Sequence, residues 1–105
     1  MKARVLSLVH AEVVEAVIYL QKQSGLGETF LNQIYSKFDE IGADPESFPL
    51  WELNPLNVEI RRVLLPRFRY VIYFQMIKHE VVITAVVHGS RDCESWLKRV
   101  RHVDF

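Results

Sequence analysis

Apolar residues in the first part of the chain recur at the three- and four-residue spacing of a helix. One stripe runs from about His10 to Gln23, and a second, cleaner one runs from Glu28 to Ile41. Between them, Gly25 is placed to end the first helix in a left-handed conformation, and Gly42 is expected to end the second. The pattern therefore predicts two helices joined by a short turn, which pack antiparallel as a hairpin.

The spacing of apolar residues changes to two in the second part of the chain. Three segments rich in β-branched and aromatic residues follow one another with short breaks: Val58–Leu65, Phe68–Ile77 and Glu80–His88. Consecutive hairpins are favoured by such short breaks. The middle segment has one apolar face and one mixed face, which predicts helices on a single side of the sheet. A proline-containing loop, Ala43 to Asn57, precedes these strands, and Lys2–Leu8 is expected to form a short first strand.

Together these elements predict an α+β fold in one domain of residues 1–105. An N-terminal strand leads into an antiparallel helical hairpin packed on one face of an antiparallel β-sheet, and Asp92 caps a short C-terminal helix. Half of the 105 residues are hydrophobic, enough for a core without disulfides. The single Cys93 suits a reducing compartment. We expect a cytoplasmic protein, because the sequence has neither an export signal nor an apolar run that could span a membrane.

Charge is divided unevenly along the chain although its formal net charge is zero. Residues 1–57 carry four Lys/Arg against eight Asp/Glu, and residues 58–105 carry nine Lys/Arg against five Asp/Glu. A basic half attracts polyanions or an acidic partner segment. The same charges would also serve simply to keep a sheet edge from aggregating, and charge alone does not separate these interpretations.

Two stretches of the second half resemble the ParE/RelE superfamily of bacterial toxins. Residues 61–74, RRVLLPRFRYVIYF, are similar to the central signature of ParE-type toxins. Residues 85–96, AVVHGSRDCESW, are similar to the closing pattern of the family. The order of elements in the first half agrees, so the resemblance covers nearly the whole chain. The chain departs from the family at Arg69 and Cys93, where proline is common.

This resemblance implies the toxin half of a type II toxin–antitoxin pair. Such a toxin is neutralised by a cognate antitoxin protein, and it meets operator DNA only indirectly, through that antitoxin. An antitoxin segment that folds onto the toxin needs long grooves, which the helical hairpin and a sheet edge would provide. ParE-like members poison DNA gyrase, whereas RelE-like members cut messenger RNA on the ribosome. A third possibility is an inert homologue that keeps only antitoxin binding.

Cleavage of RNA would require a base, cations for the phosphate and an acid. The candidates for these roles are Arg61, Arg62, His88 and Arg91. Strand alternation puts the two neighbouring arginines on opposite faces, and a histidine just before a glycine turn often bonds turn backbone. Lysines assist the base in the RelE branch, and residues 53–57, which lead into the sheet, contain none. This absence favours a poison of gyrase that makes no bonds itself.

A gyrase poison would act through its surface. The expected target contacts lie on the basic sheet edge and in the C-terminal region: Arg67, Arg69, Trp96, Arg99, Arg101 and Phe105. The sequence predicts no cofactor. It predicts no metal site either, because one cysteine and scattered histidines do not supply a tetrahedral set of ligands.

Overall fold

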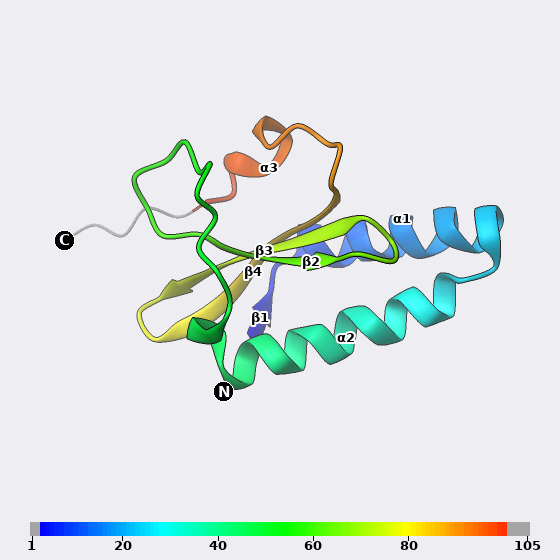
Figure 1. The fold of residues 1–105 in the computed structure, drawn as a ribbon, viewed down its shortest axis with the longest axis horizontal. Helices are drawn as coiled ribbons and strands as arrows, with labels where there is room; N and C mark the ends of the chain where they lie inside the picture. Colours follow the sequence, from blue (N-terminus) through cyan, green and yellow to red (C-terminus); the bar gives the residue numbers. More distant parts are fainter. Residues whose placement is uncertain (1–2, 101–105) are drawn as a thin grey trace.

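The computed structural model describes residues 3–100 and has the α+β content that the sequence predicts (Figure 1). Its elements are β1 (Ala3–Val5), α1 (Ser7–Ser24), α2 (Gly27–Ala43), the 3-10 turn η1 (Pro45–Ser47), β2 (Arg61–Leu65), β3 (Tyr70–Ile77), β4 (Glu80–His88) and α3 (Glu94–Leu97). The long segment between η1 and β2 is a loop, as its prolines indicate.

The four strands form one sheet in the order β1-β4-β3-β2. The pairs β2–β3 and β3–β4 are antiparallel, as expected for consecutive hairpins. β1, however, pairs with β4 in parallel, with Ala3 opposite Val81. The sheet is therefore mixed, and the prediction of an antiparallel sheet is wrong. Local alternation marks the strands, whereas the direction of β1 relative to β4 depends on the path of the helices and the long loop between them.

Side chains cover both faces of the sheet, which the sequence did not predict. The helix side holds the larger core, built on residues such as Phe30, Ile34, Ile72 and Phe74. A second core lies on the other face and consists of Trp51, Ile60, Val71, Tyr73, Ala85, Val87, Trp96 and Val100. The loop after η1 and the C-terminal segment supply its cover, and both lie on the side of the sheet away from α2 (Figure 1). The expectation of helices on one side holds for α1 and α2 only.

A β-bulge at Thr84 changes which residues of β4 face each core. Tyr73 pairs with Ala85 while Phe74 pairs with Ile83, so Thr84 is an extra residue between the two pairs. Before the bulge the odd-numbered residues face the helices, and after it the even-numbered ones do. Residues 81–87 are all buried, because one face or the other receives each of them.

The helices differ from the prediction mainly at their ends. α1 begins earlier than expected, at Ser7, and ends as predicted at Gly25, whose φ of 72° is left-handed. Gly42 lies inside α2 and does not end it. The helix instead ends before Asp44, because a residue that precedes a proline is disfavoured in the helical conformation. Close packing of the hairpin requires Gly27, since a Cβ there would lie 2.7 Å from the carbonyl oxygen of Val17.

Candidate functional site

β2 is one of the two edge strands of the sheet. On its outer side, the N–H of Trp51 donates to the carbonyl of Ile60 (2.8 Å) and the N–H of Arg62 donates to the carbonyl of Pro49 (3.2 Å). Backbone groups of every second residue point to the same side of an antiparallel strand. The carbonyl of Arg62 and both backbone groups of Leu64 therefore also point outward. Within residues 3–100, the N–H and carbonyl of Leu64 have no hydrogen-bond partner.

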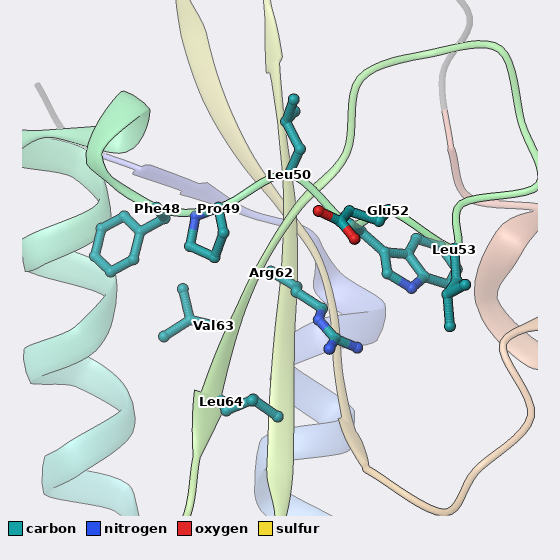
Figure 2. A pocket seen from close by; sticks show the side chains of 9 residues that line it. Phe48, Pro49, Leu50, Glu52, Leu53, Arg62, Val63 and Leu64 are labelled. Carbon is teal, nitrogen blue, oxygen red and sulfur yellow. The ribbon is translucent and has the colours of Figure 1, made fainter.

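Two hollows flank this open stretch of backbone, and both include Leu64. The first, of about 520 Å³, lies between β2 and the preceding loop (Figure 2) and is lined by Phe48, Pro49, Leu50, Trp51, Glu52, Leu53, Arg62, Val63 and Leu64. The second, of about 500 Å³, lies between α2 and the end of β2 and is lined by Thr29, Asn32, Gln33, Ser36, Lys37, Glu40, Leu64, Leu65, Pro66 and Arg67. We call the two hollows together the edge groove.

The edge groove exposes apolar side chains beside two arginines that form no ion pair with the described residues. Leu50, Leu53 and Leu64 are 49%, 82% and 56% exposed. Apolar surface gathered beside an open strand edge is typical of a site where another chain binds. Arg62 lies across the first hollow (Figure 2), and neither Arg62 nor Arg67 forms an ion pair with any residue between 3 and 100. The groove can therefore accept backbone, apolar side chains and negative charge.

Arg61, in contrast, serves the structure of the loop. Its Nη1 donates to the carbonyl oxygen of Phe48 (2.5 Å), and its Nη2 pairs with the Glu59 carboxylate (3.1 Å). Only 16% of its side chain is exposed. These bonds fasten the loop to the start of β2, so the guanidinium group of Arg61 is already occupied.

His88 and Arg91 lie together at the opposite end of the sheet. They line a pocket of about 210 Å³ with Glu12, Glu15, Ala16, Tyr19, Tyr70, Val86 and Val87. Strand register separates this pocket from Arg61 and Arg62. His88 is opposite Tyr70, whereas Arg61 is opposite Phe74. Of the four candidates for RNA cleavage, the structure thus brings together only His88 and Arg91.

The turn after β4 holds the His88 ring. The N–H of Ser90 donates to His88 Nδ1 (3.2 Å), and the Ser90 hydroxyl oxygen lies 2.7 Å from the same nitrogen. A neutral ring that accepts at Nδ1 carries its proton on Nε2. His88 therefore bonds turn backbone, as its place before Gly89 indicates.

Tyr70 gives the same pocket a phenol that stays protonated. Burial raises the pKa of Tyr70 above its ordinary value of 10.0, and the nearby Tyr19 and Glu15 raise it further. The Tyr70 and His88 rings meet edge to face, with centroids 5.5 Å apart. The pocket accordingly offers hydrogen-bond donors from both rings beside the Arg91 guanidinium.

Glu12 is a buried carboxylate whose role is not evident from the sequence. Its Oε1 accepts from the N–H of Val86 (3.2 Å) and from Nη1 of Arg99 (2.8 Å), and its Oε2 accepts from Nη2 of Arg99 (3.2 Å). Nη1 of Arg91 lies farther away, at 3.7 Å from Oε2. The sequence does carry a signal for the burial of this residue, because Glu12 stands next to Val13 inside the apolar stripe of the first helix.

The expected target contacts divide into buried and exposed groups. Trp96 is 1% exposed and packs on Tyr73, with ring centroids 4.3 Å apart. Arg99 forms an ion pair with Glu12. Trp96 and Arg99 therefore both fasten the C-terminal segment to the rest of the fold. Arg67 and Arg69 are exposed in the turn between β2 and β3. The two remaining candidates, Arg101 and Phe105, lie outside the described residues.

The sequence predicts Asp92 as the cap of the C-terminal helix, but Cys93 occupies the cap position of α3 and makes no side-chain capping bond. Oδ1 of Asp92 accepts from the N–H of Glu94 (3.1 Å), which satisfies a donor in the first turn of α3. Nε1 of Trp96, two residues further, is buried and has no hydrogen-bond partner among residues 3–100.

Within residues 3–100, no three His, Cys, Asp or Glu side chains are grouped so that they could hold a metal ion. None of the helices in that range is long and apolar enough to cross a membrane. Comparison with protein-family models and with curated proteins finds no match to this chain. The resemblance to ParE/RelE toxins therefore remains a prediction, and it rests on the residues of this chain alone.

Proposed function

We propose that the chain is the toxin of a type II toxin–antitoxin pair, which acts in the cytoplasm by binding DNA gyrase and is neutralised by a cognate antitoxin. The observation that carries this proposal is the separation of the candidate catalytic residues. Arg61 is engaged by the loop, Arg62 lies in the edge groove, and His88 and Arg91 lie at the other end of the sheet. Within residues 3–100, these candidates do not surround a single phosphodiester.

The surface of the chain supports a function in binding. The edge groove combines open backbone, exposed leucines and two arginines that form no ion pair with described residues. Arg67 and Arg69 add exposed positive charge in the neighbouring turn. Basic and apolar surface of this kind favours association with an acidic protein or a protein–DNA complex.

One observation favours RNA cleavage as the second candidate. His88, Arg91 and Tyr70 line the same pocket, and their N–H, guanidinium and O–H groups are donors that suit a phosphate. Against it, Glu15 also lines the pocket and repels an anion, and Nδ1 of His88, which would have to act as a base, already accepts from the Ser90 N–H.

The test is to induce the gene without an antitoxin and to follow DNA and protein synthesis by pulse labelling. Early loss of DNA synthesis with intact protein synthesis supports gyrase as the target, whereas early loss of protein synthesis supports RNA cleavage. If neither falls although the full chain accumulates in folded form, the chain is an inert homologue and the proposal fails.

Purified chain then separates contact residues from general charge effects. The double variant Arg67→Glu/Arg69→Glu should lose inhibition of gyrase supercoiling. Lys22→Glu, which changes one exposed charge at the end of α1, is the control and should keep it. Equal inhibition by the parent chain, the double variant and Lys22→Glu would exclude the β2–β3 turn as a gyrase contact.

A further inference from the structure

We infer that the pocket lined by His88 and Arg91 binds a small zwitterion, a molecule whose cationic and anionic groups are separated by a few bonds. This pocket lies between α1, the start of β3 and the end of β4, and we call it the His88 pocket. Its acidic end would take the cation of the ligand, and its basic end would take the anion. The inference goes beyond the proposed function and does not rest on it, because neither gyrase binding nor RNA cleavage requires such a ligand.

Glu15 supplies the acidic end of the pocket. It is exposed on α1 and forms no ion pair with any described residue. Glu12 is already occupied, because its two oxygens accept from Arg99. The charge of Glu15 acts on the pocket itself, since burial, then Tyr19 and then Glu15 raise the pKa of Tyr70. A ligand cation placed here would give Glu15 a counter-ion.

Two phenol rings line the pocket together with this carboxylate. Aromatic faces attract cations, and a phenol oxygen can accept a hydrogen bond from an ammonium group. The ring of Tyr70 packs against Phe30 and His88, with centroid distances of 5.0 and 5.5 Å. These contacts hold Tyr70 in place before a ligand arrives. Tyr19 and Tyr70 therefore add aromatic surface to the charge that favours a cation at this end.

Arg91 and His88 supply the basic end. Nη1 of Arg91 lies 3.7 Å from the Glu12 carboxylate, whereas Nη1 of Arg99 lies 2.8 Å from it. Because Arg99 is the closer partner of Glu12, the half-exposed guanidinium of Arg91 keeps donors for a ligand carboxylate. The His88 ring accepts at Nδ1 from the Ser90 N–H, so its Nε2–H is a further donor.

Charge separates a zwitterion from ligands of a single sign. An anion that binds Arg91 is also repelled by Glu15, and a cation that binds Glu15 is also repelled by Arg91. A zwitterion meets an opposite charge at both ends. Inorganic phosphate is a poorer occupant, because it has no positive group to offset Glu15.

The size of the pocket and the geometry of α1 limit the ligand. The volume of about 210 Å³ is smaller than the roughly 300 Å³ at which drug-sized sites begin. Glu12, which lies near Arg91, stands three residues before Glu15, and this spacing corresponds to about 4.5 Å along a helix. The two charges of the ligand should therefore be separated by a few methylene groups. 4-Aminobutanoate, which has three, fits better than an α-amino acid.

The experiment titrates the full 105-residue chain with 4-aminobutanoate, butylammonium, butanoate, glycine and inorganic phosphate at constant ionic strength. Amide chemical shifts of Val86, Val87 and His88 report on the pocket, and their concentration dependence gives the affinity. We expect a Kd on the order of 1 mM for 4-aminobutanoate. Butylammonium, butanoate and phosphate should each bind about tenfold more weakly, because each meets a like charge.

Two neutral variants test each end of the pocket separately. Glu15→Gln should weaken binding of 4-aminobutanoate about tenfold and tighten binding of butanoate, because the repulsion of the anion is removed. Arg91→Gln should also weaken 4-aminobutanoate binding, but it should tighten binding of butylammonium. Asp39→Asn removes an exposed carboxylate on α2 and should change no affinity. Misfolding could not produce opposite gains in the two variants, and unchanged amide shifts away from the pocket confirm the fold.

Four results would overturn the inference. They are no shift of the pocket amides at tenfold the expected Kd, equal affinity for 4-aminobutanoate and one of its singly charged analogues, tighter binding of phosphate, and full affinity in Glu15→Gln. Tighter binding of phosphate would make the pocket an anion site, as RNA cleavage requires. Tighter binding of glycine would refute the separation of the two charges. The gyrase assay is independent of these titrations, so either proposal can fail without the other.

Discussion

Glu12 and Arg99 form a two-pronged ion pair that joins the first helix to the C-terminal segment. The two nitrogen–oxygen distances are 2.8 and 3.2 Å, and only 9% and 15% of the two side chains are exposed. Because Oε1 of Glu12 also accepts from the N–H of Val86, one carboxylate connects α1, β4 and the segment after α3. Arg99 is thus a structural residue in this arrangement, although its sequence position suggests a target contact.

Removing one partner of this pair should destabilise the fold. Glu12→Ala leaves the Arg99 guanidinium and the Val86 N–H without their acceptor, and we expect a loss of about 3 kcal/mol in the free energy of unfolding. Urea unfolding of Glu12→Ala, Arg99→Ala and the double variant measures this loss. The double variant should lose less than the sum of the single losses; strict additivity would mean that the two side chains do not interact.

Trp96 should contribute to stability chiefly through its size. Trp96→Ala removes a buried ring that packs on Tyr73 and Trp51 and should cost about 3–5 kcal/mol. Trp96→Phe should cost clearly less, because it keeps most of the ring contacts and removes Nε1, a buried donor with no partner in the part of the chain that the structure describes. Thermal unfolding of both variants gives the comparison. Equal losses for the two variants would contradict the expectation that ring contacts provide most of the contribution of Trp96.

The turn between β3 and β4 stores backbone strain. Lys78 and His79 have φ values of 51° and 66°, a left-handed pair that suits Asn-Gly and disfavours long side chains. His79→Gly should therefore raise the free energy of unfolding by about 1 kcal/mol. Lys22→Gly, placed on right-handed helical backbone, should lower it by about the same amount. A lower urea midpoint for His79→Gly would contradict the strain at this turn.

Tyr70 should make stability fall at alkaline pH. Its pKa is raised in the folded chain by burial first and then by Tyr19 and Glu15, so folding favours the protonated phenol. This contribution is complete below the ordinary tyrosine pKa of about 10 and is lost as the pH rises through the raised value. Tyr70→Phe should remove that part of the alkaline decline.

Phenolate absorbance and urea unfolding, both followed from neutral to alkaline pH, check this expectation. The slope of stability against pH should be smaller for Tyr70→Phe than for the parent chain. Tyr35→Phe is the control, because Tyr35 is exposed on α2. An equal decline in the parent and in Tyr70→Phe would refute the assignment.

The candidate site was only partly accessible to sequence reasoning. Arg62, Arg67, His88 and Arg91 were recognised as chemistry-bearing residues, and the contact of His88 with turn backbone followed from its place before Gly89. Which of them share a surface was not accessible. That grouping depends on strand register and on the path of the loop that Arg61 fastens to β2.

By itself, the sequence determined the elements that depend on neighbouring residues. Helical and alternating periods identified α1, α2 and the three consecutive strands, and Gly25 marked the end of the first helix. Tertiary structure alone decided the parallel pairing of β1, the bulge at Thr84, the second core, the Glu12–Arg99 pair and the edge groove. The physical reason is that a hydrophobic period shows that a side chain is buried. What it is buried against depends on packing between segments far apart in the chain.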